Sequence, residues 1–155
     1  MRGLSFLLDG ELFAVDVTLV RKVVRNITFT PIHAAPGAVV GIANIKGRIV
    51  TVLSLAELLG REKSAGAVNA VVFKPLTDGN DQMGLLIDKQ GDLIDIDENE
   101  ILPPPRTAGE EEKSCISGMA EVAGTLYRII NIDSIISRFK DDAEDAGKDA
   151  ADTIS

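Results

Sequence analysis

The acidic side chains of residues 88–100 are the group best suited to chemistry, because neighbouring carboxylates could bind calcium. From Asp95 to Glu100, acidic or amide side chains stand at alternate positions, as the ligands do in an EF-hand loop. Such a loop needs glycine at its sixth position for a sharp turn, and Glu100 occupies that position here. Residues 78–81 fail the same comparison. We interpret both stretches as solvated surface and predict no metal site.

Nucleophilic or zinc chemistry would depend on His33 and Cys115, the only histidine and the only cysteine. A catalytic triad needs a nucleophile, a base and an orienting group, and no spacing in the chain identifies them. A zinc site usually takes several Cys or His ligands. No glycine-rich phosphate-binding motif is present either. We therefore expect an ordinary loop histidine at position 33, an inert Cys115 in or beside a strand, and no cofactor.

The many acids leave one enzymatic alternative open. The paired carboxylates of a glycoside hydrolase are recognised by their separation in space, which a sequence does not give. A small carboxylate-dependent hydrolase would need a pocket with convergent acids of shifted pKa. Because no other catalytic group is in view, the sequence favours a non-catalytic binding module.

Length and charge narrow the class further. The 155 residues are 45% apolar, which suits one domain with a substantial core or two small fused barrels. The net charge of −8 argues against binding to nucleic acid. No apolar run is long enough for membrane insertion, and the unpaired cysteine favours a cytoplasmic protein. Residues 140–155 hold six acids and two lysines, so we expect one domain over residues 1–139 and a disordered acidic tail over 140–155.

The stretch from residue 41 to residue 60 organises the predicted fold. Two apolar strands flank a turn at Lys46-Gly47, where glycine supplies the backbone freedom of a tight reversal. Apolar residues on both faces of the second strand, residues 49–53, predict that it is buried on both sides. Leucines at helical spacing follow, and Gly60 is the expected C-cap. The stretch contains no obvious catalytic group.

The remaining segments also indicate a mostly β architecture with short helices at the junctions. Asp9-Gly10 and Ala123-Gly124 are further predicted hairpin turns. Asp16 and Asp97 are expected to cap short helical turns, and Asn131 or Asp133 a final helix. We expect the highly charged residues 106–113 to be mobile. Additional strands are expected at residues 4–8, 12–15, 68–73, 83–87, 92–96, 116–122 and 126–130.

Residues 41–55, GIANIKGRIVTVLSL, resemble the signature Gly-Val-x-Asn-Leu-Arg-Gly-x-Ile-Val-Pro-Val-Ile-Asp-Leu of CheW-like chemotaxis adaptors. Further segments resemble the family in the expected order, and together they extend from about residue 4 to residue 139. These segments are residues 13–17, 27–31, 35–36, 84–88, 101–105, 116–118 and 128–133.

The resemblance implies an all-β fold of two SH3-like five-stranded barrels that share an interior, and no catalytic activity. The halves would run over residues 12–66 and 67–130, with the N-terminal strand and a C-terminal helix completing the fold. It further implies a scaffold that couples the cytoplasmic tips of methyl-accepting chemotaxis receptors to the regulatory domain of the histidine kinase CheA. The protein would then work in the cytoplasm, at the inner face of the membrane.

Carried over to this chain, the resemblance places Val20, Lys22, Asn44, Lys46 and Gly47 near receptor or kinase contacts. Lys46 stands where the family usually has arginine, and Lys22 where an acidic residue is common. These departures permit an alternative, an adaptor in a kinase array that does not serve chemotaxis. The same five positions also have an architectural interpretation, in which Asn44 and Gly47 shape the turn, Val20 is core and the lysines are solvated.

Overall fold

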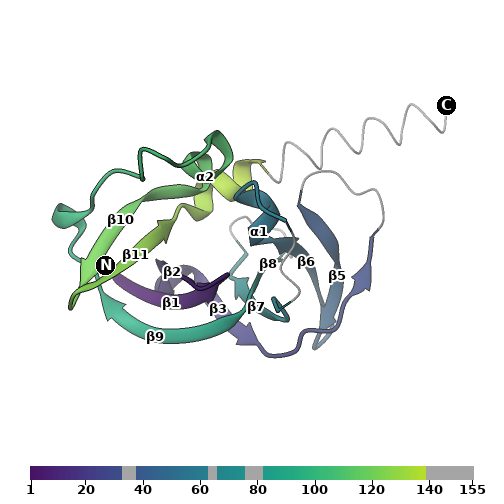
Figure 1. Cartoon of the computed structure of the whole chain (residues 1–155). Coiled ribbons are helices and arrows are strands. Elements are labelled where there is room, and N and C mark those ends of the chain that lie inside the picture. Colours follow the sequence, from purple (N-terminus) through teal and green to yellow (C-terminus); the bar gives the residue numbers. More distant parts are fainter. Residues whose placement is uncertain (33–37, 63–65, 76–81, 139–155) are drawn as a thin grey trace.

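The computed structural model describes residues 1–32, 38–62, 66–75 and 82–138 (Figure 1). Its strands are β1 (Arg2–Leu8), β2 (Glu11–Asp16), β3 (Val20–Val24), β4 (Thr30–Pro31), β5 (Val39–Ile45), β6 (Arg48–Ser54), β7 (Asn69–Phe73), β8 (Gln82–Ile87), β9 (Lys89–Asp95), β10 (Ile116–Val122) and β11 (Thr125–Ile130). The short helices are η1 (Val17–Leu19), α1 (Leu55–Leu58), η2 (Glu98–Glu100) and α2 (Glu110–Cys115). Residues 132–138 are helical at the end of the described chain.

The strands gather in two sheets, which confirms the predicted mostly β fold with a C-terminal helix. The first sheet has the order β10–β11–β2–β1–β9, and the second has the order β3–β7–β8–β6–β5–β4 (Figure 1). The second sheet has a sixth strand because the two-residue β4 pairs with the edge of β5. His33, residues 78–81 and the tail over residues 140–155 lie outside the described part of the chain.

Three tight turns set the register of the hairpins β1–β2, β5–β6 and β10–β11. Each has two central residues at positive φ, as a type I′ turn requires. These pairs are Asp9-Gly10 (52° and 77°), Lys46-Gly47 (53° and 81°) and Ala123-Gly124 (51° and 81°). All three predicted turns are therefore confirmed.

Four of the five described helices begin with a side-chain cap, and the sequence predicts three of these four caps; α2 begins after Gly109 without one. Asn131 Oδ1 accepts a hydrogen bond from Ser134 N at 3.2 Å, so Asn131 rather than Asp133 caps the final helix. Ser54 caps α1 although aspartate is the frequent residue there in the family signature. The other caps are Asp16 for η1 and Asp97 for η2.

Two local predictions are wrong. The charge of residues 106–113 predicts a mobile connection, yet α2 begins at Glu110. That helix is held because Cys115 is buried and Glu112 lies between two arginines from other elements. The predicted burial of both faces of residues 49–53 fails at Ile49, which is 53% exposed. The first error involves neighbours that are distant in the sequence.

Each sheet combines strands from the first half of the chain with strands from the second half. The hairpin β1–β2 joins β9, β10 and β11, whereas β7 and β8 join β3 to β6. The chain therefore starts in the first sheet, forms the whole second sheet with β3 to β8, and returns to the first sheet. The boundaries of the two sheets do not coincide with residues 12–66 and 67–130, and a division into barrels at those residues stays a prediction. Among the described strands, each sheet contains one parallel pair, and one strand of that pair leads into a helix. In the second sheet β6 runs parallel to β8 and is followed by α1. In the first sheet β11 runs parallel to β2 and is followed by the helix over residues 132–138.

The apolar side chains form one large cluster between the sheets and a smaller one for each sheet. We call the large cluster the shared core; it includes Phe6, Phe13 and Val15 of the first sheet, Leu53, Val71 and Leu85 of the second, and Leu55 and Leu58 of α1. The smaller clusters contain Val50, Val52, Val72 and Leu86 in the second sheet, and Ala14, Ala120 and Ile129 in the first. The shared core therefore ties the two sheets together.

Gly41 is the point where β5 passes closest to β4. A Cβ atom added there would lie 2.5 Å from Thr30 O and would overlap the Phe29 ring. Gly41→Ala should therefore lower the free energy of unfolding by about 1–2 kcal/mol, because backbone must shift to make room. Urea denaturation followed by circular dichroism measures this change. Gly84→Ala is the matched control, since its Cβ would meet neighbours at 3.4 Å or more. Equal losses in the two variants would contradict the steric explanation.

Candidate functional site

Three of the five predicted site residues lie together in the β5–β6 turn. Asn44 Oδ1 accepts a hydrogen bond from Gly47 N at 3.0 Å, and Gly47 has the positive φ of the turn. Their architectural role is therefore directly visible. Lys46 is exposed at the tip of the same turn. The tip lies at the opposite end of β6 from α1 (Figure 1).

The other two predicted residues lie in β3, at the far edge of the same sheet. Val20 pairs with Phe73 and packs partly against the shared core. Lys22 pairs with Val72 after an irregularity in the strand register, and both Val20 and Lys22 are half-buried. Their positions leave part of each side chain accessible to a partner.

Gln82 brings these two segments together. It is the first residue of β8, 4% exposed, and pairs with Val50. With its amide oxygen turned toward the two guanidinium groups, it accepts hydrogen bonds from Arg21 at 3.0 Å and from Arg48 at 3.2 Å. The opposite amide orientation would place an NH₂ group against two donors, so hydrogen bonding selects this one. Arg21 separates Val20 from Lys22, and Arg48 follows Gly47, so all the predicted residues flank one junction.

The junction is strongly basic in a protein that is acidic overall. We call Arg21, Lys22, Lys46, Arg48 and Gln82 the basic end of the second sheet. None of its four cations forms an ion pair with a carboxylate of the described residues. The field here is therefore opposite in sign to the net charge of −8 and would attract an acidic surface.

Apolar side chains are exposed on the outer face of β5 and β6 beside the basic end. Ile49 pairs with Asn44 and is 53% exposed, and Ile42 pairs with Thr51 and is 39% exposed. Residues two apart in a strand share a face, so Ile42 and Asn44 point to the same side as Ile49. Exposed aliphatic groups beside charges are typical of protein interfaces.

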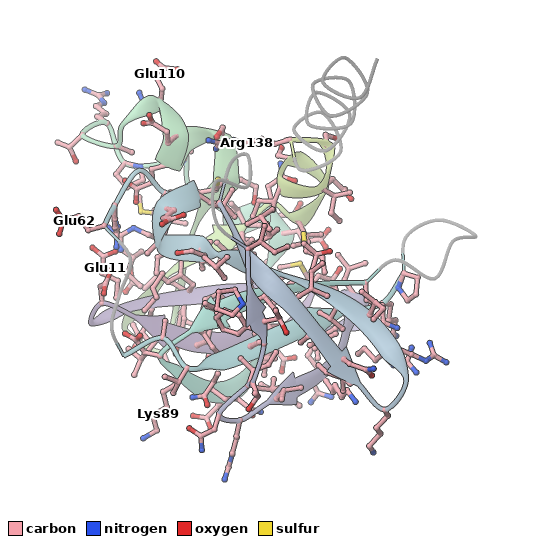
Figure 2. All side chains as sticks on the ribbon, turned by 90° about the vertical axis from the view of Figure 1, so that its right-hand side faces the viewer. Glu11, Glu62, Lys89, Glu110 and Arg138 are labelled. Carbon is pink, nitrogen blue, oxygen red and sulfur yellow. The ribbon has the colours of Figure 1, made fainter. Side chains whose placement is uncertain are left out.

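A second charged group is held together by ion pairs between elements. Arg61, which follows α1, and Arg128 of β11 each approach both Glu11 of β2 and Glu112 of α2. The four side chains are between 15% and 34% exposed, and we call them the charged quartet. Figure 2 shows Glu11 on the flank of the molecule below the helix that carries Glu110. Because each carboxylate is engaged by two arginines, this pair of acids is arranged for structure and not as a free acid–base pair.

An open hollow of about 580 Å³ lies between α2 and the final helix, and Arg138 is one of its lining residues. Its lining includes Ser114, Ser134 and the buried Cys115. Cys115 Sγ is 3.4 Å from Leu58 O, and burial raises the pKa of the Cys115 thiol above its ordinary value. A raised pKa favours the protonated thiol, which is less nucleophilic than the thiolate. Among the described residues, no group of three or more His, Cys, Asp or Glu side chains could hold a metal ion.

Arg21, Arg48 and Gln82 are the site residues that the sequence analysis missed. Alternation along the strands carries a signal for two of them. Arg48 shares the inward phase of Val50 and Val52, and Gln82 that of Gly84 and Leu86. Polar side chains in an inward phase at a strand end indicate a hydrogen-bonded polar cluster that closes that end of the sheet. Arg21 joins the same cluster because of the register of β3, and the sequence does not give that register.

Comparisons with known proteins all match one family. A family model described as the CheW-like domain matches residues 2–140. The chain is 28% identical over 133 residues to the chemotaxis protein CheW of Thermotoga maritima, covering 86% of this chain and 85% of the relative. It is 24% identical over 132 residues to the chemotaxis protein CheW of Rhizobium meliloti, covering 85% and 84%.

A solved structure is similar as well. The crystal structure of the scaffolding protein TtCheW from Thermoanaerobacter tengcongensis superposes with a TM-score of 0.71 at 28% identity, covering 84% of this chain and 88% of that one. In the described part of the present structure, no helix has the length and apolar character needed to cross a membrane.

Proposed function

This chain belongs to the CheW-like domain family, and from that premise we propose that it is a non-catalytic adaptor coupling chemoreceptor tips to the histidine kinase CheA. The match over residues 2–140 is the observation that carries the proposal. The adaptor would act in the cytoplasm, through the receptors' cytoplasmic tips and the regulatory domain of the kinase. Two named relatives are chemotaxis proteins and the similar solved structure is a scaffolding protein, which supports an adaptor role.

The basic end is the part of the surface that we assign to partner contacts. Val20, Lys22, Asn44, Lys46 and Gly47 are the proposed contact residues, with Asn44 and Gly47 acting mainly by presenting Lys46 at the tip of a fixed turn. The exposed Ile42 and Ile49 supply apolar area on the neighbouring face. Interfaces of this kind are individually modest, and repetition in an array makes them strong through multivalency.

The experiment that tests the function is a pull-down with the full chain as bait. The cognate kinase regulatory domain and a receptor-tip fragment serve as prey, separately and together. Lys46→Glu should weaken capture of at least one partner about tenfold, because it reverses a charge at the tip of the turn. Lys89→Glu is the matched control, since Lys89 is also exposed and follows β8 at the end opposite Gln82. Failure of the unmodified chain to bind either partner would overturn the proposed function.

One observation favours a second candidate, an adaptor for a kinase array that does not serve chemotaxis. In the family an acidic residue is common where this chain has Lys22, and here that lysine joins Arg21, Arg48 and Lys46 in one basic end. A surface with this charge suits a partner that differs from the usual one. Identification of the kinase that co-purifies with the chain separates the two candidates.

A further inference from the structure

Arg21 and Arg48 come from different strands of the second sheet, yet both reach the same amide oxygen. That oxygen lies 3.0 Å from Arg21 Nη1 and 3.2 Å from Arg48 Nη1. Gln82 is only 4% exposed, whereas both arginines are exposed. A buried neutral group thus holds two solvent-facing guanidinium groups side by side.

Within the described residues, Gln82 is the one side-chain hydrogen-bond partner of these two arginines. A guanidinium carries several N–H donors in a planar fork, and Gln82 takes a single hydrogen bond from each group. No carboxylate of the described residues forms an ion pair with Arg21 or Arg48. Where arginines converge elsewhere, in the charged quartet, two glutamates neutralise them. The pair at Gln82 is therefore two like charges held close, with no counter-charge among the residues that the structure describes.

We propose that Arg21, Gln82 and Arg48 form a binding site for one carboxylate, carried by an Asp or Glu side chain of the partner protein. Guanidinium groups bind carboxylates through paired, charge-assisted hydrogen bonds. A carboxylate between the two arginines removes their mutual repulsion at the same time. The proposal rests on the proposed adaptor function and adds to it the residue type that the partner must present.

The surroundings favour a protein carboxylate over other anions. Ile49 is 53% exposed in the strand phase opposite to that of Arg48, so its apolar surface meets the charged site around the end of β6. Lys22 follows Arg21 in β3 and Lys46 precedes Arg48 by two residues, so both lysines add positive charge near the site. Nucleic acid would meet a chain of net charge −8, which repels a long polyanion outside this one patch.

The test is calorimetric titration of the full chain with the cognate kinase regulatory domain and with the receptor-tip fragment, at low and at high ionic strength. Arg21→Gln and Arg48→Gln should each weaken binding of one and the same partner about tenfold, the loss expected for a hydrogen bond to a charged group. Both variants should also reduce the salt dependence of that affinity. Arg25→Gln is the matched control, because Arg25 is exposed and follows the other end of β3. Circular dichroism confirms that each variant is folded.

The outcomes are distinguishable. If the unmodified chain binds neither partner, the adaptor function and the carboxylate site are both overturned. If it binds both, and the Arg21 and Arg48 variants bind as well as the Arg25 control, only the carboxylate site is overturned. Recovery of binding between an Arg21→Glu, Arg48→Glu chain and a partner with one acid replaced by lysine supports the site most directly.

Two other occupants are tested with the arginine side-chain N–H signals in NMR spectra of the full chain. Saturable shifts of the Arg21 and Arg48 signals with inorganic phosphate, at concentrations that leave Arg25 unaffected, would identify a free anion as the ligand and overturn the proposal. Shifts of the same signals on deletion of residues 141–155 would identify the acidic tail of the chain as the occupant and overturn it likewise. Unchanged signals in both experiments, with the tenfold loss above, support the partner's carboxylate.

Discussion

Replacing Phe13 by alanine should lower the free energy of unfolding by about 3–5 kcal/mol, the cost of emptying a large, fully buried aromatic position. Phe13 lies in β2, is 0% exposed and stacks on Phe6, with the ring centroids 5.6 Å apart. Both rings belong to the shared core, which also contains side chains of the second sheet and of α1. The variant therefore removes contacts that join the two sheets as well as contacts within the first.

The location of Phe13 also predicts how the loss is distributed. Because the shared core ties the sheets together, Phe13→Ala should lower the stability of both sheets in one transition, seen as equal loss of hydrogen-exchange protection in β2 and β8. Val50→Ala is the comparison, since Val50 is buried in the cluster of the second sheet alone. Because the sheets unfold in one transition, Val50→Ala should also lower protection in both sheets, by a smaller amount because it removes fewer buried atoms. Loss of protection confined to the first sheet in Phe13→Ala would contradict a core common to both.

The elements of this fold could be predicted from the sequence because their signals are local. Asp9-Gly10, Lys46-Gly47 and Ala123-Gly124 each specify a reversal through backbone conformations that few residues adopt readily. Asp16 and Asp97 cap helical turns whose first residues follow them directly. Family resemblance then supplied the expectation of two fused barrels, which no local signal contains, and the strands do gather in two sheets.

The charged groups could not be predicted because each depends on elements far apart in the chain. The basic end requires residues 21, 48 and 82 to meet, which follows only from the pairing of β7 and β8 with β3 and β6. The resemblance gives Lys22 and Lys46 as candidate contact residues, whereas the two arginines that converge on Gln82 have no counterpart in the quoted motif. In the same way, the sequence of α2 is that of a charged, mobile segment, and only the structure shows that Arg61 and Arg128 form ion pairs with Glu112.

Glu112→Gln should lower the free energy of unfolding by about 2–3 kcal/mol. The change removes one of two carboxylates from the charged quartet and leaves Arg61 and Arg128 as partly buried like charges with only Glu11 between them. Full burial of a broken ion pair costs more, and the 15–34% exposure of these side chains reduces the loss. Chemical denaturation with urea, which adds no ionic strength, measures the difference.

The quartet joins α2, the segment after α1 and two strands of the first sheet. The effects of substitutions at its four positions on the free energy of unfolding should therefore depend on one another. Glu110→Gln is the matched control, because Glu110 is exposed in the same helical turn and pairs with no arginine of the described residues. In a double-mutant cycle, Arg61→Gln combined with Glu112→Gln should cost less than the sum of the single changes, since the second removes a charge that the first left unpaired. High salt should shrink the Glu112 effect by screening the exposed edge of the quartet. Strict additivity, or a Glu110 effect as large as that of Glu112, would show that the four side chains do not act as a unit.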